Sequence, residues 1–225
     1  MEYLPNGYTL TVGEGCFPLS TDSMVLSSFV RLPKNARVLD LGSGCGTLGL
    51  LLCAANDSCH VTGLELCETA HSCALENIRA NSLEQRLNSI CTDLRTYAET
   101  GFDVCVSNPP YFSGGPAAAK LTAARREDSC TTEELFRAAA KALRYGGDFY
   151  LVHRPERLGQ LCACAEANGL APKRLQLVRH KEGGPVSLIL LACRKGGKHG
   201  LLWEELTLHK ADGTPTEEFR SIYHI

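Results

Sequence analysis

Short apolar runs alternate with longer amphipathic stretches along most of this chain. The short runs predict strands, because four to eight apolar residues between turn signals are typical of buried strands. These strands are expected near residues 37–41, 60–65, 88–92, 102–107, 147–153, 174–180 and 186–194. Apolar positions three and four apart predict helices at 22–32, 46–55, 68–81, 131–144 and 155–168. Asp22 is the expected N-cap of the first helix, and residues 131–134 have the character of a capping box.

Strict alternation of strands and helices predicts a doubly wound, mostly parallel sheet with helices on both faces. The link at 181–185 is too short for a crossover, so the last two predicted strands form a hairpin and one strand runs antiparallel. We therefore expect an α/β, Rossmann-like fold with seven strands. Residues 1–35 are expected to form an N-terminal strand and helix extension packed on one domain at 36–225. The tail at 200–225 is expected to add a final strand or turn.

A glycine-rich turn follows the first long strand. Glycines stand at positions 42, 44, 46 and 49, directly before an apolar helix. Glycines at such a turn let backbone N–H groups approach a ligand closely, and the helix N-terminus favours a carboxylate or a phosphate. The segment 44–49 matches G-x-G-x-x-G, and Glu65 ends the next strand about twenty residues later. A nicotinamide dinucleotide is therefore one candidate ligand.

Asp40, two positions before the first glycine, favours a different cofactor. A carboxylate there repels a pyrophosphate but can orient an ammonium group, which S-adenosylmethionine carries and a nicotinamide dinucleotide does not. In that case Glu65 would bind both ribose hydroxyls. Asp93 would accept a hydrogen bond from the adenine amine, next to the backbone N–H of Leu94. The alternative for Asp93 is an ordinary turn or N-cap acid, since aspartate is frequent at strand ends.

The tetrapeptide Asn108-Pro109-Pro110-Tyr111 follows the fourth predicted strand. The side-chain oxygen of Asn108 and the carbonyl of Pro109 can each accept one N–H of a planar amine, and this support strengthens as positive charge develops. The two prolines hold these acceptors in place. Tyr111 or Phe112 can stack on a base. The pattern indicates methyl transfer to an exocyclic amine; the alternative is a strand that ends in a proline turn.

Together these motifs resemble the bacterial tRNA N6-adenine methyltransferases, which modify valine tRNA at the adenine just 3′ of the anticodon. The resemblance extends from about Gly7 to the C-terminus and includes Phe17–Asp22 and Ala124–Glu127. It implies a class I methyltransferase fold, S-adenosylmethionine as cofactor and tRNA as partner. The implied catalytic residues are Asn108, Pro109 and Tyr111. The residues expected at the cofactor are Thr21, Asp22, Asp40, Gly42, Gly44, Gly46, Glu65, Leu66, Asp93, Leu94 and Asn108.

Charge is divided unevenly along the chain. Residues 1–119 hold 6 Lys and Arg against 12 Asp and Glu, whereas residues 120–225 hold 17 against 13. Basic residues close to the tetrapeptide are candidates for RNA phosphates. The RNA-binding candidates are Tyr111, Phe112, Lys120, Arg125 and Arg126. The alternative is a solvated surface, to which the sequence pI of about 6.4 gives weight.

Composition narrows the remaining possibilities. The sequence lacks a membrane-length apolar stretch and a signal-peptide pattern, so we expect a cytoplasmic protein. Most of the 12 cysteines fall in apolar segments without metal-ligand spacing, so we expect reduced thiols and no metal site.

Two other functions stay open. An N5-glutamine methyltransferase of a protein substrate would use the same tetrapeptide, although residues 1–35 are short for its helical substrate domain. A non-catalytic nucleotide-binding or RNA-binding module would have no use for the amine acceptors.

Overall fold

The structure, a computed structural model, describes residues 2–4, 7–13, 16–109 and 130–225. Of the sequence candidates, Tyr111, Phe112, Lys120, Arg125 and Arg126 lie outside these described residues. A short antiparallel pair, β1 (Glu2–Tyr3) and β2 (Thr9–Leu10), precedes the main sheet. Among the described residues, no helix combines the length and the apolar character needed to cross a membrane.

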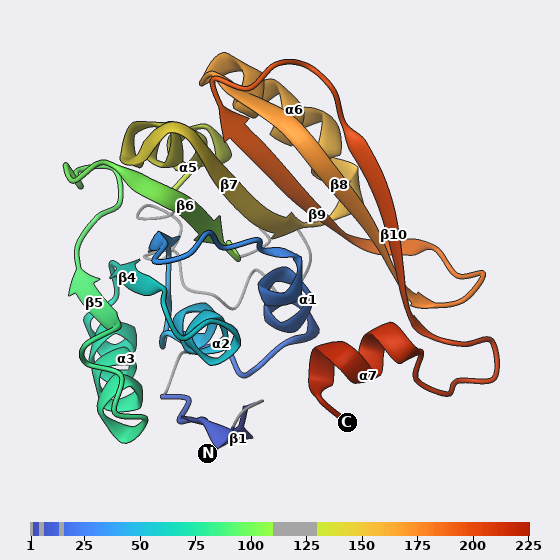
Figure 1. The fold of residues 1–225 in the computed structure, drawn as a ribbon, viewed down its shortest axis with the longest axis horizontal. Coiled ribbons are helices and arrows are strands. Elements are labelled where there is room, and N and C mark those ends of the chain that lie inside the picture. Colours follow the sequence, from blue (N-terminus) through green and yellow to red (C-terminus); the bar gives the residue numbers. More distant parts are fainter. Residues whose placement is uncertain (1, 5–6, 14–15, 110–129) are drawn as a thin grey trace, which may run out of the picture.

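The centre of the molecule is an eight-stranded sheet with the order β10-β8-β9-β7-β6-β3-β4-β5 (Figure 1). Its strands are β3 (Arg37–Leu41), β4 (His60–Glu65), β5 (Leu87–Cys91), β6 (Phe102–Ser107), β7 (Leu143–His153), β8 (Leu170–Lys181), β9 (Val186–Lys195) and β10 (Leu202–His209). Strand β9 is antiparallel to both of its neighbours, and the other pairs are parallel. The predicted mostly parallel sheet and its single antiparallel strand are confirmed. The eighth strand, β10, comes from the tail that the sequence pattern left as a strand or turn.

The strand order changes direction next to β3. From β3 the chain proceeds outward through β4 and β5, and then returns to place β6 on the other side of β3. Asp40 on β3 pairs with Gly63 on one side and with Val106 on the other. A crevice for a ligand is expected outside the carboxyl ends of strands at such a switch point. The turns that follow β3, β4 and β6 therefore meet at this edge.

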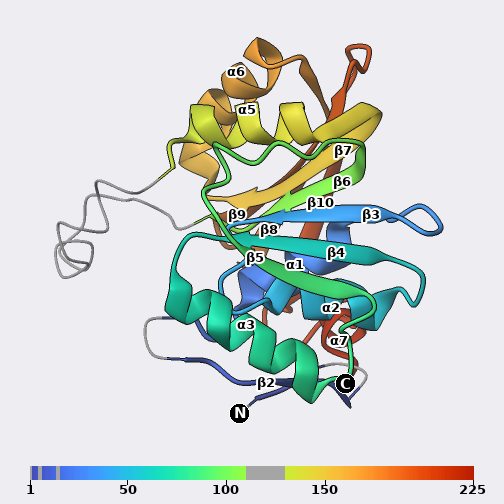
Figure 2. The same ribbon diagram turned by 90° about the vertical axis from the view of Figure 1, so that its left-hand side faces the viewer.

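Helices cover both faces of the sheet (Figure 2). One face carries α1 (Thr21–Phe29), α2 (Thr47–Ala55), α3 (Glu68–Ala80) and α7 (Glu217–Tyr223), and the other carries α5 (Thr132–Ala142) and α6 (Leu158–Ala167), which follows a 3-10 turn at Pro155–Arg157. Each face has its own apolar core. On the first face, α1 buries Met24, Val25, Leu26 and Phe29 in the same core as α2 and β3. The N-terminal segment therefore packs directly on the sheet domain.

Two predicted helix starts have different outcomes. Helix α1 begins at Thr21, and its N-cap is Ser20, whose hydroxyl accepts a hydrogen bond from the Ser23 N–H at 3.3 Å. The expected N-cap at Asp22 and the expected end at residue 32 were wrong. Serine and aspartate are nearly equal as N-caps, and Val30 already has an extended backbone. The predicted capping box of α5 is confirmed, since the Thr131 and Glu134 side chains each accept a hydrogen bond from the other's backbone N–H.

Candidate active site

The glycine turn between β3 and α2 forms the floor of the candidate site. Gly42 and Gly44 have φ values of 77° and 57°, and a Cβ atom added at either would meet no atom within 4 Å. The left-handed backbone, not lack of space, therefore requires glycine at these positions. The N–H groups of Gly42 and Ser43 both donate to the Leu64 carbonyl at 3.0 Å, which ties the turn to β4. Gly46, with φ 86°, is the N-cap residue of α2 and offers no side-chain cap.

Asp40, on β3 two residues before Gly42, is only 1% exposed. Among the described residues, neither of its carboxylate oxygens has a hydrogen-bond partner, and the buried Ser43 hydroxyl has none either. Burial, followed by the nearby negative charge of Glu65, raises the pKa of Asp40 to about 8. A buried carboxylate without a partner is costly. Such a group at the edge of a crevice is expected to meet a cation that the ligand supplies.

Glu65, the last residue of β4, holds the backbone of the glycine turn through hydrogen bonds. Its Oε2 accepts a hydrogen bond from the Gly44 N–H and its Oε1 from the Cys67 N–H, both at 2.8 Å. Each carboxylate oxygen has a second lone pair, so Glu65 can still accept from hydroxyl groups of a ligand. Leu66, which follows it, is 47% exposed. The sequence placed Glu65 at a strand end; its contact with the glycine turn adds a role in shaping the backbone there.

S-adenosylmethionine fits this set of residues. The orphaned Asp40 carboxylate suits the ammonium of its methionine part, and Glu65 suits ribose hydroxyls. The open backbone around Gly42 and Gly44 leaves room for a ligand to approach. A pyrophosphate would instead meet two carboxylates, Asp40 and Glu65, of which the first is already destabilised by the charge of the second. The two carboxylates therefore favour a cationic ligand over an anionic one.

Asp93 follows β5 and is held by a residue that the sequence analysis missed. Arg95 donates to both carboxylate oxygens of Asp93 at 2.6–3.0 Å, and the Arg95 backbone N–H adds a further bond at 2.8 Å. The hydrogen bonds and charge of Arg95 lower the pKa of Asp93. Arg95 also lies 3.6 Å from Glu134 in the α5 capping box. The spacing Asp-x-Arg was the only sequence signal for this pair. The expected role of Asp93 at adenine stays a prediction, and Leu94 beside it is half-buried.

Asn108 stands two residues beyond Val106, the strand partner of Asp40. Its side-chain Nδ2 donates to the Ser23 hydroxyl of α1 at 3.1 Å. Ser107, between them, is fully buried and donates from its hydroxyl to the Leu41 carbonyl at 2.8 Å, which fixes the end of β6 against β3. The structure therefore brings Asn108 and the partly buried Pro109 to the edge that also holds Asp40.

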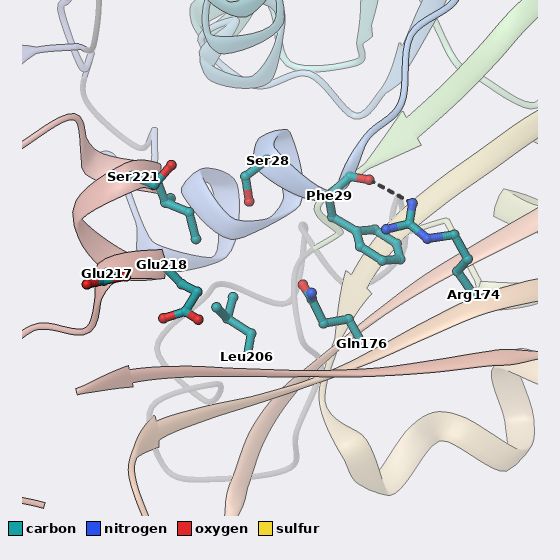
Figure 3. A pocket seen from close by; sticks show the side chains of 9 residues that line it. Ser28, Phe29, Arg174, Gln176, Leu206, Glu217, Glu218 and Ser221 are labelled. Atoms are coloured by element: carbon teal, nitrogen blue, oxygen red, sulfur yellow. Dashed lines mark hydrogen bonds between the residues drawn. The ribbon is translucent and has the colours of Figure 1, made fainter. Parts of the chain in front are cut away.

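The first turn of α1 lies at the same edge. Thr21 and Asp22 are half-buried there. The Thr21 hydroxyl is 3.3 Å from the Tyr223 hydroxyl of α7. A cavity of about 450 Å³ lies at the opposite end of α1, between α1, β8, β10 and α7 (Figure 3). It contains none of the residues that the sequence predicted at the cofactor.

Comparisons with known proteins agree on one family. The model of the methyltransferase small domain matches residues 19–160. A tRNA1(Val) (adenine(37)-N6)-methyltransferase from Tolumonas auensis is 34% identical over 206 residues, which cover 89% of this chain and 86% of the relative. The enzyme of the same name from Bacteroides fragilis is 31% identical over 202 residues, covering 85% and 84%.

Solved structures show the same fold. A predicted O-methyltransferase, Atu636 from Agrobacterium tumefaciens, superposes with a TM-score of 0.77 at 20% identity, over 91% of this chain and 96% of that one. The T. Thermophilus 16S rRNA N2 G1207 methyltransferase, in complex with AdoMet and guanosine, superposes with a TM-score of 0.57 at 23% identity, over 81% and 45%. The chain is thus an S-adenosylmethionine-dependent methyltransferase that belongs to the methyltransferase small domain family and, within it, to the tRNA1(Val) (adenine(37)-N6)-methyltransferases.

Proposed function

We propose that this enzyme methylates N6 of an adenine in tRNA, in the cytoplasm. The observation that carries the proposal is the strand register, because it places Asn108 two residues past the partner of the orphaned Asp40. The groups proposed as amine acceptor and cofactor anchor thereby share one edge of the sheet. The names of the Tolumonas and Bacteroides relatives support adenine in tRNA as the substrate.

The cofactor-binding roles follow from the polar groups at this edge. S-adenosylmethionine supplies an electrophilic methyl group on a sulfonium. Asp40 binds its ammonium, with Thr21 and Asp22 near the methionine end. Glu65 accepts from the ribose hydroxyls while its other lone pairs keep Gly44 and Cys67 in place. The backbone at Gly42, Gly44 and Gly46 would lie against the cofactor, Leu66 would flank it, and Asp93 with the Leu94 N–H would bind its adenine.

The amine-binding roles belong to the turn after β6. The Asn108 side-chain oxygen and the Pro109 carbonyl each accept one N–H of the substrate amine. These bonds strengthen as the nitrogen becomes positive during transfer, so they stabilise the transition state more than the ground state. From the sequence alone, Tyr111 or Phe112 stacks on the base, and Lys120, Arg125 and Arg126 contact phosphates.

The test replaces Asn108 with alanine. Asn108→Ala is expected to reduce kcat by about 100-fold or more, which is typical of losing one preorganised transition-state contact. The dissociation constant of S-adenosylmethionine, measured by calorimetry, is expected to stay within about twofold of the wild type, because Asp40 and Glu65 remain. Asn88→Ala, at an exposed position of β5, is the matched control. Unchanged turnover of Asn108→Ala would remove the proposed amine contact.

A further inference from the structure

We propose that Ser23 of α1 is a positioning residue for methyl transfer: its hydroxyl holds the Asn108 carboxamide with Oδ1 turned toward the amine. The inference rests on the proposed function and adds a residue that the sequence motifs do not include. Ser23 is only 5% exposed, and its Oγ accepts from Asn108 Nδ2 at 3.1 Å across 85 residues of sequence. It acts through Asn108 and has no direct role at the substrate.

Ser23 differs from the other serines of its helix. Ser27 and Ser28 donate their hydroxyls at 2.8 Å to the carbonyls of Met24 and Val25 in the same helix. Such internal bonds are the usual fate of a serine within a helix. The Ser23 hydroxyl instead links α1 to the turn after β6. The contact thus connects the N-terminal segment to the proposed acceptor of the amine.

The orientation of the Asn108 carboxamide decides whether its oxygen can accept a hydrogen bond from the amine. A carboxamide has an acceptor on one side and a donor on the other. With Nδ2 toward Ser23, Oδ1 lies on the opposite side, where it can accept an amine N–H. In the flipped orientation Nδ2 would face the amine, and two donors would meet. A residue that fixes this choice therefore controls transition-state stabilisation without touching the substrate.

A neighbouring hydroxyl can accept the proton of the Ser23 hydroxyl. Ser20 Oγ lies 3.3 Å from Ser23 Oγ and already accepts a hydrogen bond from the Ser23 N–H as the N-cap of α1. When the Ser23 hydroxyl donates its single proton to Ser20, only its lone pairs face Asn108. Those lone pairs accept from Nδ2 and offer no proton to Oδ1. In this arrangement the two serines support the orientation that Asn108 needs.

Helix α1 is anchored at both ends, as a positioning element must be. At its start, the Thr21 hydroxyl meets that of Tyr223, whose ring stacks on Phe219 with a centroid distance of 4.2 Å. At its end, Arg174 donates to the Phe29 carbonyl at 3.1 Å and lies 4.1 Å above the Phe29 ring (Figure 3). Glu204 of β10 in turn holds the Arg174 guanidinium with two bonds, at 2.9 and 3.0 Å. The C-terminal segment thus fixes the helix that carries Ser23.

The experiment compares Ser23→Ala with Ser27→Ala, the control on the same helix. For Ser23→Ala we expect kcat to fall about 10- to 100-fold, as a small misplacement of a reacting group can cause. The KM for tRNA and the dissociation constant of S-adenosylmethionine are expected within about twofold of the wild type. Equal kcat values for the two variants would overturn the inference. If the wild type itself methylated no adenine in tRNA, the proposed function would fail instead.

A second variant covers the case in which Ser23→Ala also disturbs folding. Ser23→Thr keeps a hydroxyl at the same carbon, so it is expected to recover most of the lost kcat and to leave the thermal midpoint near that of the wild type. A fall in both kcat and thermal midpoint for Ser23→Ala, without recovery in Ser23→Thr, would assign Ser23 a purely structural role and overturn the inference.

Discussion

Replacing Asp40 with asparagine is expected to stabilise the cofactor-free protein at high pH and to weaken cofactor binding. Asp40 is buried without a hydrogen-bond partner, and its pKa of about 8 is far above the ordinary value of 3.8. At low pH the carboxyl is protonated in both the folded and the unfolded chain. As the pH rises past 4, the unfolded chain loses this proton first. The free energy of unfolding therefore falls until about pH 8 and then levels off.

The size of the effect follows from the two pKa values. The difference between the two pKa values corresponds to a loss of about 6 kcal/mol in the free energy of unfolding, as an upper estimate. About a quarter of this loss has already occurred by pH 5. Asp40→Asn removes this pH dependence. The buried amide has its own desolvation cost of about 1–3 kcal/mol, but that cost is the same at both pH values. The gain in stability at pH 9 is therefore expected to exceed the change at pH 5 by about 4 kcal/mol.

Urea unfolding at pH 5 and pH 9, without cofactor, measures this difference. Asp57→Asn, at an exposed position, is the control and should change stability by no more than about 0.5 kcal/mol at either pH. Calorimetry on the same proteins should show S-adenosylmethionine bound at least about tenfold more weakly by Asp40→Asn, since one buried ion pair is lost. Equal stability changes at pH 5 and pH 9 would refute the claim that Asp40 is a destabilised acid in the free enzyme.

Two further predictions concern the capping box and the proposed RNA contacts. Thr131→Ala removes the side-chain acceptor for the Glu134 N–H and should lower the free energy of unfolding by about 1 kcal/mol in urea; a change no larger than that of Thr132→Ala would contradict this. The double variant Arg125→Ala with Arg126→Ala should weaken tRNA binding and reduce the slope of log K against log salt by about 0.7–0.9 for each lost phosphate contact. An unaltered salt slope would exclude phosphate contacts by this pair.

Local sequence patterns were sufficient to predict most strands of the sheet. The predicted bounds of β3, β4 and β6 agree with the structure to the residue, because a parallel strand buried on both faces appears as a continuous apolar run. Strand β10 was harder to predict. It carries Glu204 and Glu205, and Trp203 within it is 60% exposed. Its place in the sheet depends on its pairing with β8, which no local pattern encodes.

Some residues of the candidate site could likewise be predicted from local patterns, and others could not. Asp40, Glu65 and the glycine turn were visible in the sequence because they follow one another at strand ends. Ser23 and Arg95 were not identified. The partner of Ser23, Asn108, is brought to it by the fold, and Arg95 showed only the local spacing Asp-x-Arg. A helical serine has many possible partners, and nothing near residue 23 indicates that residue 108 will lie beside it. The sequence motifs thus predicted the groups proposed to meet the ligands, while the residues that orient those groups required the structure.

The most direct test of the account is methyl transfer from radiolabelled S-adenosylmethionine into unmodified tRNA, followed by digestion to nucleosides and identification of the labelled one. The account predicts label in N6-methyladenosine, and its loss in Asn108→Ala. Absence of label from every nucleoside, with S-adenosylmethionine still bound by the enzyme, would contradict it. Label on glutamine in a parallel assay with a protein acceptor would instead assign the turn at Asn108 to a carboxamide substrate.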